Sequence, residues 1–323
     1  MVNNMNKNNG FLCEYYSAVT ACDVEWLWYP YIPYGKLTIL QGDPGEGKST
    51  FMLSIAALLT CGAPMPDGYR VDGPKNVIYQ TAEDNIADTV KPRLIHAGAD
   101  CKRVAYIVDS DVSLTLDDER IERALQETKA RLFILDPLQA YLSQDSDMMM
   151  AGRMRQQLRK LSKVAERYNC AMVIIGHMNK SSAEKNLYRG LGSIDIAAIA
   201  RSVLMIARDK TDPMIRYMFP VKTSLAPEGK PIAFSFGAEH GIEWIGQREI
   251  SINTINRVVQ DESKLEFAKR MVTEMLTDRD LYSSTIVKKM KVMGVSERTL
   301  SIAKKDLGIT SYKKNGVWFW HMD

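Results

Sequence analysis

One short segment, GDPGEGKST from Gly42 to Thr50, constrains the fold of this chain more than any other feature. It places Gly42, Gly47, Lys48 and Ser49 in the spacing G-x-x-x-x-G-K-S, directly after the apolar run KLTILQG and before the apolar run FMLSIAALLT. A glycine-rich loop between a strand and a helix lets backbone amides point inward at a phosphate chain, and the helix N-terminus adds partial positive charge. A turn that matches by chance is the alternative, and the flanking strand and helix argue against it.

The loop therefore predicts a nucleotide site that also binds Mg²⁺. In this spacing Lys48 reaches the β- and γ-phosphates, and the hydroxyl of Ser49 binds the ion. The motif alone does not distinguish kinases, switch GTPases, transporters and motors. The residues expected to contact nucleotide are Gly42, Asp43, Pro44, Gly45, Glu46, Gly47, Lys48, Ser49 and Thr50.

Short apolar runs alternate with helical stretches through the first two hundred residues. The expected strands are KLTILQG, NVIYQTAE, VAYIVDS, RLFILDP and AMVIIGH, and residues 148–169 repeat apolar side chains at helical spacing. This alternation predicts an α/β fold with a mostly parallel sheet flanked by helices. Beyond Arg201 the runs SVLMIAR, MIRYMFPV, IAFSFG and IEWIG predict hairpin strands that extend the sheet at one edge.

The length of 323 residues predicts one large domain and one small one. We expect a disordered tail at residues 1–12, an ATPase core at 13–252 and a small domain at 253–323. The net charge of the whole chain is only +3, but residues 281–323 hold eight basic and three acidic side chains, a net of +5. The remainder is then −2, so positive charge is concentrated at the C-terminal end.

Five cysteines with no C-x-x-C pair, and only four histidines, predict neither a disulfide framework nor a zinc site. The chain opens with the polar stretch MVNNMNKNNG, and no apolar run reaches the roughly 18 residues that a membrane span needs. We therefore expect a cytoplasmic protein with no membrane partner.

Two carboxylates follow predicted strands. Asp136 ends RLFILDP, where a Walker-B carboxylate holds the water shell of Mg²⁺, although it could also be a turn residue before Pro137. Glu83 follows NVIYQTA on the strand expected beside that of the P-loop, and a carboxylate there can deprotonate the attacking water. The other interpretation is that Glu83 or Asp84 caps a helix that starts near Asn85.

His177 and Arg201 are weaker candidates from the sequence. His177 ends the predicted strand VIIGH at the edge of the sheet where ligands bind, and it could sense the γ-phosphate or be only a polar residue of that edge. Arg201 follows a polar, glycine-rich segment, and an arginine offered to a neighbouring subunit couples many ring ATPases. A surface ion pair is the alternative for Arg201.

The C-terminal segment predicts three helices and a strand pair. The helices are expected from Lys264 to about Leu276, from Ser283 to Lys291 and from Ser296 to Leu307, with the strands in ITSYKKNGVWFWHMD. This order is the outline of a winged helix-turn-helix. A protein-interaction module with a solvated basic face is the alternative. The side chains expected to contact DNA are Arg298, Thr299, Lys304 and Lys305 on the last helix and Lys313 and Lys314 on the wing.

Six ordered features between about Val24 and Gly237 together resemble the RepA-like branch of RecA-fold ATPases, the hexameric replicative helicases of plasmids, phages and other mobile elements. The features are WLWYPYIPYGKLTILQGDPGEGKST, TAED, ILDPLQAYL, GHMNK, RGLGSIDIAAIARS and VKTSLAP. The C-terminal extension departs from the minimal plasmid helicase, which raises origin binding or loading as a task beside strand unwinding.

The resemblance implies a RecA-like core that hydrolyses ATP at the subunit interfaces of a homohexamer acting on single- or double-stranded DNA. It implies that Lys48 and Ser49 bind ATP and Mg²⁺ and that Glu83 is the catalytic base. Asp136 would be the Walker-B acid, His177 the γ-phosphate sensor and Arg201 the arginine finger. Lys222 lies where related proteins place a basic residue near the neighbouring nucleotide. A replication initiator or a primase is a possible partner.

Two other functions share these residues. A RecA- or RadA-like recombination and repair ATPase would form filaments in place of closed rings. A nucleotide-gated DNA-binding regulator would turn over ATP slowly and act through its winged helix. A P-loop kinase is a more distant alternative, because no acceptor-binding signature is visible.

Overall fold

A computed structural model describes most of the chain as two compact units, each of which is treated by itself below. The larger unit is formed by residues 1–207 and 214–248, and the smaller by residues 208–213 and 249–323. The predicted tail at residues 1–12 lies outside the described residues. Those are 13, 15–109, 112–142, 147–177, 198–209, 212–237, 241–252, 264–276, 280–292, 295–314 and 316–322.

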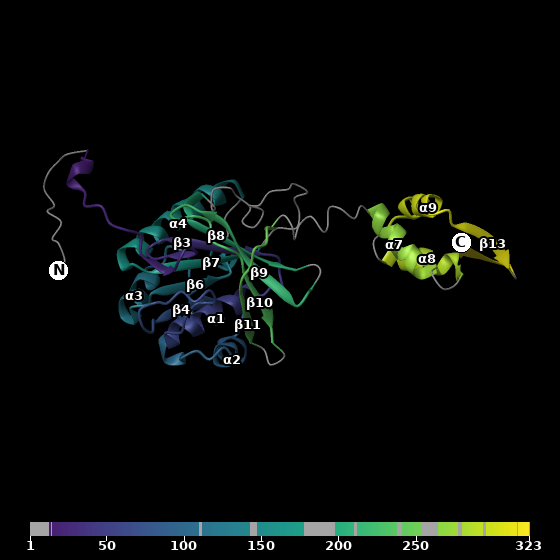
Figure 1. Cartoon of the computed structure of the whole chain (residues 1–323). Coiled ribbons are helices and arrows are strands. Elements are labelled where there is room, and N and C mark those ends of the chain that lie inside the picture. Colours follow the sequence, from purple (N-terminus) through teal and green to yellow (C-terminus); the bar gives the residue numbers. More distant parts are fainter. Residues whose placement is uncertain are drawn as a thin grey trace. The chain divides into compact units, whose positions relative to one another are not determined.

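The larger unit is built on one sheet (Figure 1). Within the described residues its strand order is β11-β10-β9-β8-β3-β7-β6-β4-β5. The strands are β3 (Leu37–Gly42), β4 (Val77–Thr81), β5 (Val104–Ala105), β6 (Leu132–Asp136), β7 (Ala171–His177), β8 (Ser202–Arg208), β9 (Ile215–Thr223), β10 (Ile232–Phe236) and β11 (Ile242–Gln247). A small hairpin, β1 (Trp26–Trp28) and β2 (Ile32–Pro33), precedes them. The pairs from β8 to β5 are parallel, which confirms the predicted α/β fold.

The strands β8 to β11 extend the sheet at one edge, as expected, and β8 joins them to β3 by parallel pairing. Two other details of the sheet differ from the prediction. The run VAYIVDS contributes only the two residues of β5. The strand β4 does not neighbour β3, because β7 and β6 lie between them. Strand order depends on crossover connections, which local periodicity does not encode.

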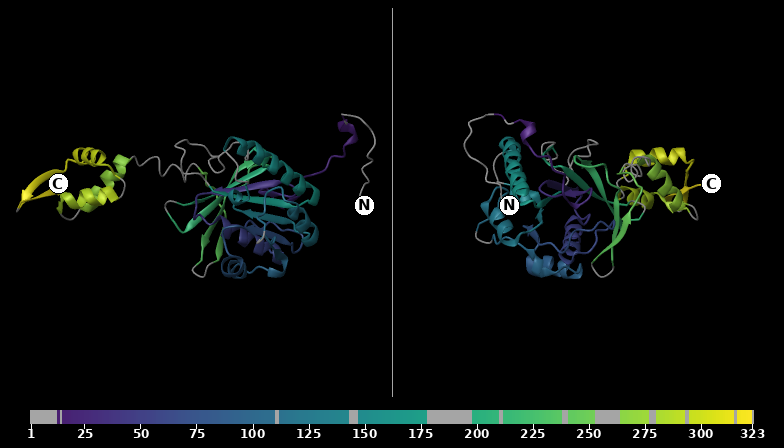
Figure 2. Two further views of the ribbon diagram at one scale, coloured as in Figure 1. Left: turned by 180° about the vertical axis from the view of Figure 1, so that it is seen from behind. Right: turned by 60° about the vertical axis from the view of Figure 1, so that its left-hand side comes forward.

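Helices cover both faces of the sheet, as the ribbon views show (Figures 1 and 2). On one face lie α1 (Lys48–Cys61) and α2 (Lys91–His96), and on the other α3 (Glu119–Thr128) and α4 (Asp147–Tyr168). Strands enclosed on both faces, such as β3, β4 and β6, are buried at every position, which explains why their sequences are mostly apolar. None of the described helices is long and apolar enough to cross a membrane.

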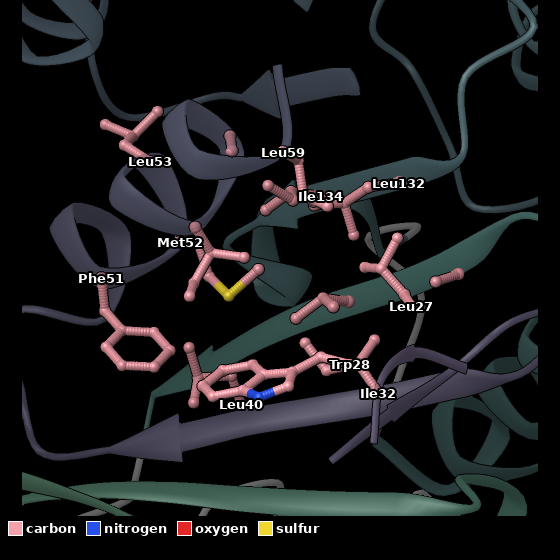
Figure 3. Packing of buried hydrophobic residues seen from close by; sticks show 14 of the residues in the cluster. Leu27, Trp28, Ile32, Leu40, Phe51, Met52, Leu53, Leu59, Leu132 and Ile134 are labelled. Atoms are coloured by element: carbon pink, nitrogen blue, oxygen red, sulfur yellow. The ribbon is translucent and has the colours of Figure 1, made fainter. Parts of the chain in front are cut away.

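The core between α1 and the sheet anchors the loop that precedes this helix (Figure 3). Trp28 of β1 and Phe51 of α1 are fully buried there and stack at 6.5 Å between ring centroids. Leu40 of β3 and Ile134 of β6 close the same cluster from the sheet. Burying side chains of this size stabilises the unit by about 1.5–3 kcal/mol each, so the start of α1 is held firmly beneath the loop.

The smaller unit has its own core. Its elements are α7 (Lys264–Leu276), β12 (Leu281–Tyr282), α8 (Ser283–Val292), α9 (Glu297–Asp306), β13 (Thr310–Lys314) and β14 (Val317–His321). The strands form an antiparallel sheet in the order β12-β14-β13. The predicted helices and final strand pair are therefore present. Ser296 caps α9 as expected, accepting a hydrogen bond from the amide of Thr299 at 3.1 Å.

Candidate active site

The loop 42–49 joins the end of β3 to the start of α1, as the sequence predicts. Its glycines are required by close packing. Gly47 has a φ of 87°, and a Cβ there would collide with Cζ of Phe236 on β10. A Cβ at Gly42 would lie 2.5 Å from the carbonyl oxygen of Ile206 on β8. Larger residues at these positions would push the loop off β8 and β10, so the loop keeps its curvature only with glycine.

Lys48 is the electrostatic centre of the site. Its side chain is buried, and Nζ donates hydrogen bonds to the carbonyl oxygens of Gly42 at 2.8 Å and Asp43 at 2.9 Å. Burial lowers the pKa of Lys48, while the negative charges of Asp136, Asp43, Glu46 and Glu83 act in the opposite direction. The structure thus gathers four carboxylates from three segments around one lysine.

Asp136 lies at the end of β6, two strands away from the P-loop strand. It is only 4% exposed, and its Oδ2 accepts a hydrogen bond of 2.6 Å from the hydroxyl of Tyr79 on β4. Burial, together with Asp136, raises the pKa of Tyr79 well above its ordinary value, so the phenol remains a donor. Its burial and hydrogen bond distinguish Asp136 from an ordinary exposed turn residue.

Glu83 follows β4 by two residues and is exposed. Thr81, at the end of β4, pairs with Asp136 in the sheet and accepts a hydrogen bond at Oγ1 from the amide of Glu83 at 3.3 Å. This register brings Glu83 to the same edge of the sheet as Asp136, although its strand is not beside β3.

The helical turn after Glu83 is capped differently from the sequence interpretation. Asn85 is its N-cap, accepting hydrogen bonds from the amides of Ala87 and Asp88 at 2.8 and 3.3 Å. Asp84 instead forms an ion pair of 2.7 Å with Arg93. The capping alternative for Glu83 and Asp84 is therefore wrong, and the carboxylate of Glu83 is not used as the N-cap.

His177 is the last residue of β7, the strand between β3 and β6. Its backbone position pairs with Gly42. Strand pairing therefore sets His177 between the loop of Lys48 and the strand of Asp136, at the C-terminal edge where the sequence predicts it.

Arg201 and Lys222 lie near the start of β3, whereas the P-loop follows the end of that strand. The amide of Arg201 donates to the carbonyl of Leu37, the first residue of β3, at 3.0 Å, and Arg201 is exposed. Lys222, near the end of β9, donates to the carbonyl of Ala200 at 2.9 Å. Burial first, and the charge of Arg201 second, lower the pKa of Lys222. The two cations are neighbours and are remote from their own chain's P-loop.

Sequence reasoning missed three residues around the site. Tyr79 is one, and the others are Arg216 of β9 and Phe236 of β10, which lie against the P-loop. The guanidinium of Arg216 is 4.4 Å from the ring centroid of Phe236, and its Nε is 3.9 Å from a carboxylate oxygen of Glu46. The available signal was a polar residue inside an otherwise apolar strand, such as Arg216 or Tyr79. Such groups are buried only where they find a partner.

The DNA-contact candidates of the smaller unit do not all point into solvent. Arg298 and Lys305 on α9, and Lys313 and Lys314 on β13, are exposed. Lys304 was expected to face outward, but it is half-buried. Its Nζ donates to Oγ of Ser311 and lies 4.8 Å from the ring centroid of Trp320. Thr299 is likewise half-buried and shares a hydrogen bond of 2.8 Å with Ser296. Contacts with the β13–β14 hairpin therefore engage Lys304, and the cap of α9 engages Thr299.

The residues at the P-loop edge fit ATP and Mg²⁺. The loop is closely packed where glycines are required, and Lys48, the only lysine buried among the described residues, lies within the charge field of four carboxylates. Across the described residues no cluster of three or more His, Cys, Asp or Glu side chains could hold a metal ion by itself. Mg²⁺ takes one or two protein oxygens and completes its shell with water and phosphate, and the carboxylate of Asp136 can supply such an oxygen.

A P-loop at the C-terminal edge of a mostly parallel sheet, with a buried carboxylate two strands away, defines a P-loop ATPase with a RecA-like core. This chain belongs to the AAA_25 family, whose model is described as an AAA domain and matches residues 18–183, more than half of the chain.

The chain is also similar to DNA repair proteins named RadA. The protein of Halalkalibacterium halodurans is 28% identical over 152 residues, which are 46% of this chain and 29% of RadA. The protein of Bacillus subtilis is 25% identical over 151 residues, again 46% of this chain and 29% of RadA. The match thus spans less than a third of the length of these relatives.

Proposed function

We propose that this protein is an ATP-driven DNA motor, a RepA-like replicative helicase of a mobile element that hydrolyses ATP between the subunits of a ring. The proposal is supported by the positions of two groups of candidate residues at opposite ends of the strands of one sheet. Lys48, Asp136 and Glu83 lie at the P-loop edge, and Arg201 lies with Lys222 at the other. An ATPase assembled this way completes its site only with a neighbouring copy.

The roles of the residues follow from their positions. Lys48 and the amides of residues 42–49 would bind the phosphates, and Ser49 and Asp136 would hold Mg²⁺, which supplies charge neutralisation between the β- and γ-phosphates. Glu83, exposed beside Asp136, would take the proton of the attacking water. His177, beside Gly42, would sense the γ-phosphate and transmit its presence along β7.

The arrangement predicts complementation between two inactive variants. Arg201→Ala should lose about 10³-fold or more in ATP hydrolysis, because an arginine finger contributes about 10³–10⁵ in kcat. Mixing it with Lys48→Ala should restore part of the activity, since some interfaces then combine an intact P-loop with an intact Arg201. Phosphate release from mixtures of the two variants measures this. Full activity of Arg201→Ala alone, or no recovery on mixing, would contradict a finger acting in trans.

We further propose that residues 253–323 form a winged helix that binds DNA and that residues 13–252 are the ATPase core. The helix order, the β13–β14 hairpin and the exposed pairs Arg298 with Lys305 and Lys313 with Lys314 support this. On such modules the last helix reads the major groove and the wing contacts phosphate.

Salt dependence of duplex binding tests the module. Lys313→Ala with Lys314→Ala should weaken binding and reduce the slope of log K against log[salt] by about 0.9 for each phosphate that is no longer neutralised. The substitution is cleaner than deleting residues 281–323, because the buried side chains of α7 pack against α8 and α9 in one core. Lys91→Ala with Lys102→Ala removes two exposed charges from the ATPase core and is the control. Equal slopes for the two double variants would refute a DNA role for the wing.

The similarity to RadA favours a second candidate, a recombination or repair ATPase, since those relatives are named DNA repair proteins. Particle mass with ATP and single-stranded DNA separates the two functions. A closed ring of six supports the helicase, whereas an open filament on the strand supports the recombinase. A replication initiator or primase would be sought as a partner only for the ring.

A slow, nucleotide-gated DNA-binding regulator is the third candidate. Measuring ATP hydrolysis with and without single-stranded DNA distinguishes it from a motor. Strong stimulation, together with unwinding of a forked duplex, supports the helicase. No stimulation and no unwinding would favour the regulator.

A further inference from the structure

Tyr79 is a polar residue at the centre of an otherwise apolar core. It is the middle residue of β4, its side chain is 1% exposed, and its ring belongs to the same cluster as Phe51 and Met52 of α1. A phenylalanine would fill this space equally well and would avoid the cost of burying a hydroxyl. The hydroxyl of Tyr79 therefore calls for an explanation beyond packing.

That hydroxyl connects two elements of the candidate active site. It donates to Oδ2 of Asp136, the last residue of β6, at 2.6 Å. Tyr79 and Asp136 are 57 positions apart and lie on the neighbouring strands β4 and β6. The phenol thus restrains the carboxylate that is proposed to act with Mg²⁺.

We propose that Tyr79 is a positioning residue that orients the carboxylate of Asp136 for Mg²⁺ bound with nucleotide. The inference rests on the proposed ATP site and goes beyond it. A hydrogen bond at Oδ2 restrains the carboxylate plane and leaves Oδ1 for the water shell of the ion. Because the ring is locked between β4 and α1, the restraint is rigid. Removing such outer partners typically lowers metal affinity about 10–100-fold.

The test is Tyr79→Phe in the full-length protein. Binding of a fluorescent ATP analogue is measured in EDTA and then at increasing Mg²⁺, and Mn²⁺ bound to the nucleotide complex is followed by EPR. We expect binding in EDTA to stay within about twofold of the wild type, while the Mg²⁺ concentration at half-saturation rises about tenfold. The Mn²⁺ spectrum of the variant should broaden, because the carboxylate of Asp136 beside the ion is no longer held in one orientation.

The matched control is Tyr141→Phe. Tyr141 is buried five residues after Asp136, and its hydroxyl has no hydrogen-bond partner among the described residues. This variant should keep the wild-type Mg²⁺ dependence. An unchanged Mg²⁺ half-saturation in Tyr79→Phe would overturn the proposal, as would an equal loss of binding in EDTA and in Mg²⁺, which would indicate a purely structural role. A wrong location for the proposed ATP site would show itself separately. In that case Lys48→Ala would bind the analogue as tightly as the wild type.

Discussion

Replacing Lys48 with alanine is expected to reduce ATP hydrolysis by at least about 10²–10³-fold, the usual cost of removing one donor from developing transition-state charge. The reason lies in the position of Nζ. It is buried beside the carbonyls of Gly42 and Asp43, and four carboxylates surround it. Without the cation these carboxylates would repel a polyphosphate. Weaker binding of a fluorescent ATP analogue and loss of phosphate release are the measurements.

Lys48→Arg is the informative companion of Lys48→Ala. It keeps the positive charge but replaces a compact ammonium by a planar guanidinium that does not fit the same pair of carbonyls. We expect it to retain more nucleotide binding than the alanine variant and to remain poor in hydrolysis. Circular dichroism of both variants checks that the unit is folded. Hydrolysis at the wild-type rate in Lys48→Ala would show that this P-loop is not the site of turnover.

Glu83→Gln is expected to reduce the rate of hydrolysis by about 10²–10⁴-fold while nucleotide binding is retained. Glutamine keeps the shape of the side chain and removes its ability to accept a proton. Glu83 is exposed and follows Thr81, whose backbone pairs with Asp136, so the substitution removes no buried packing. Single-turnover hydrolysis, measured beside equilibrium binding of the analogue, separates the chemical step from affinity.

Asp84→Asn is the control for Glu83→Gln, because it makes the same chemical change on the next residue. Asp84 pairs with Arg93 at 2.7 Å, both side chains are about one-third exposed, and such pairs contribute about 0–1 kcal/mol to stability. Its hydrolysis rate should stay close to that of the wild type. A larger loss of rate in Asp84→Asn than in Glu83→Gln would show that Glu83 is not the catalytic base.

Several features of the site could be predicted from local sequence. The P-loop, the strand that ends at Asp136 and the strand that ends at His177 are contiguous patterns whose chemistry depends on neighbouring residues. The helix α9 and its N-cap Ser296 could be predicted for the same reason. Local patterns could not supply the order of the strands, so the strand before Glu83 was expected beside β3 when two strands intervene.

The contacts of individual side chains also depended on residues far away in the sequence. Lys304 was expected in solvent, but Trp320 and Ser311 of the following hairpin engage it. Tyr79 was predicted only as part of a strand, because its partner Asp136 is 57 positions away. Arg216 and Phe236 support the P-loop from strands nearly two hundred residues downstream.

The sequence by itself determined that this chain folds as an α/β P-loop protein with a basic C-terminal module, because glycine spacing, apolar runs and charge are local properties. Only the tertiary structure decided which strands lie side by side, that the hydroxyl of Tyr79 donates to Asp136, and that Arg201 and Lys222 lie at the strand ends opposite their own P-loop. Those relations arise from parallel pairing between segments far apart in the chain, and pairing of that kind is settled only when the whole core packs.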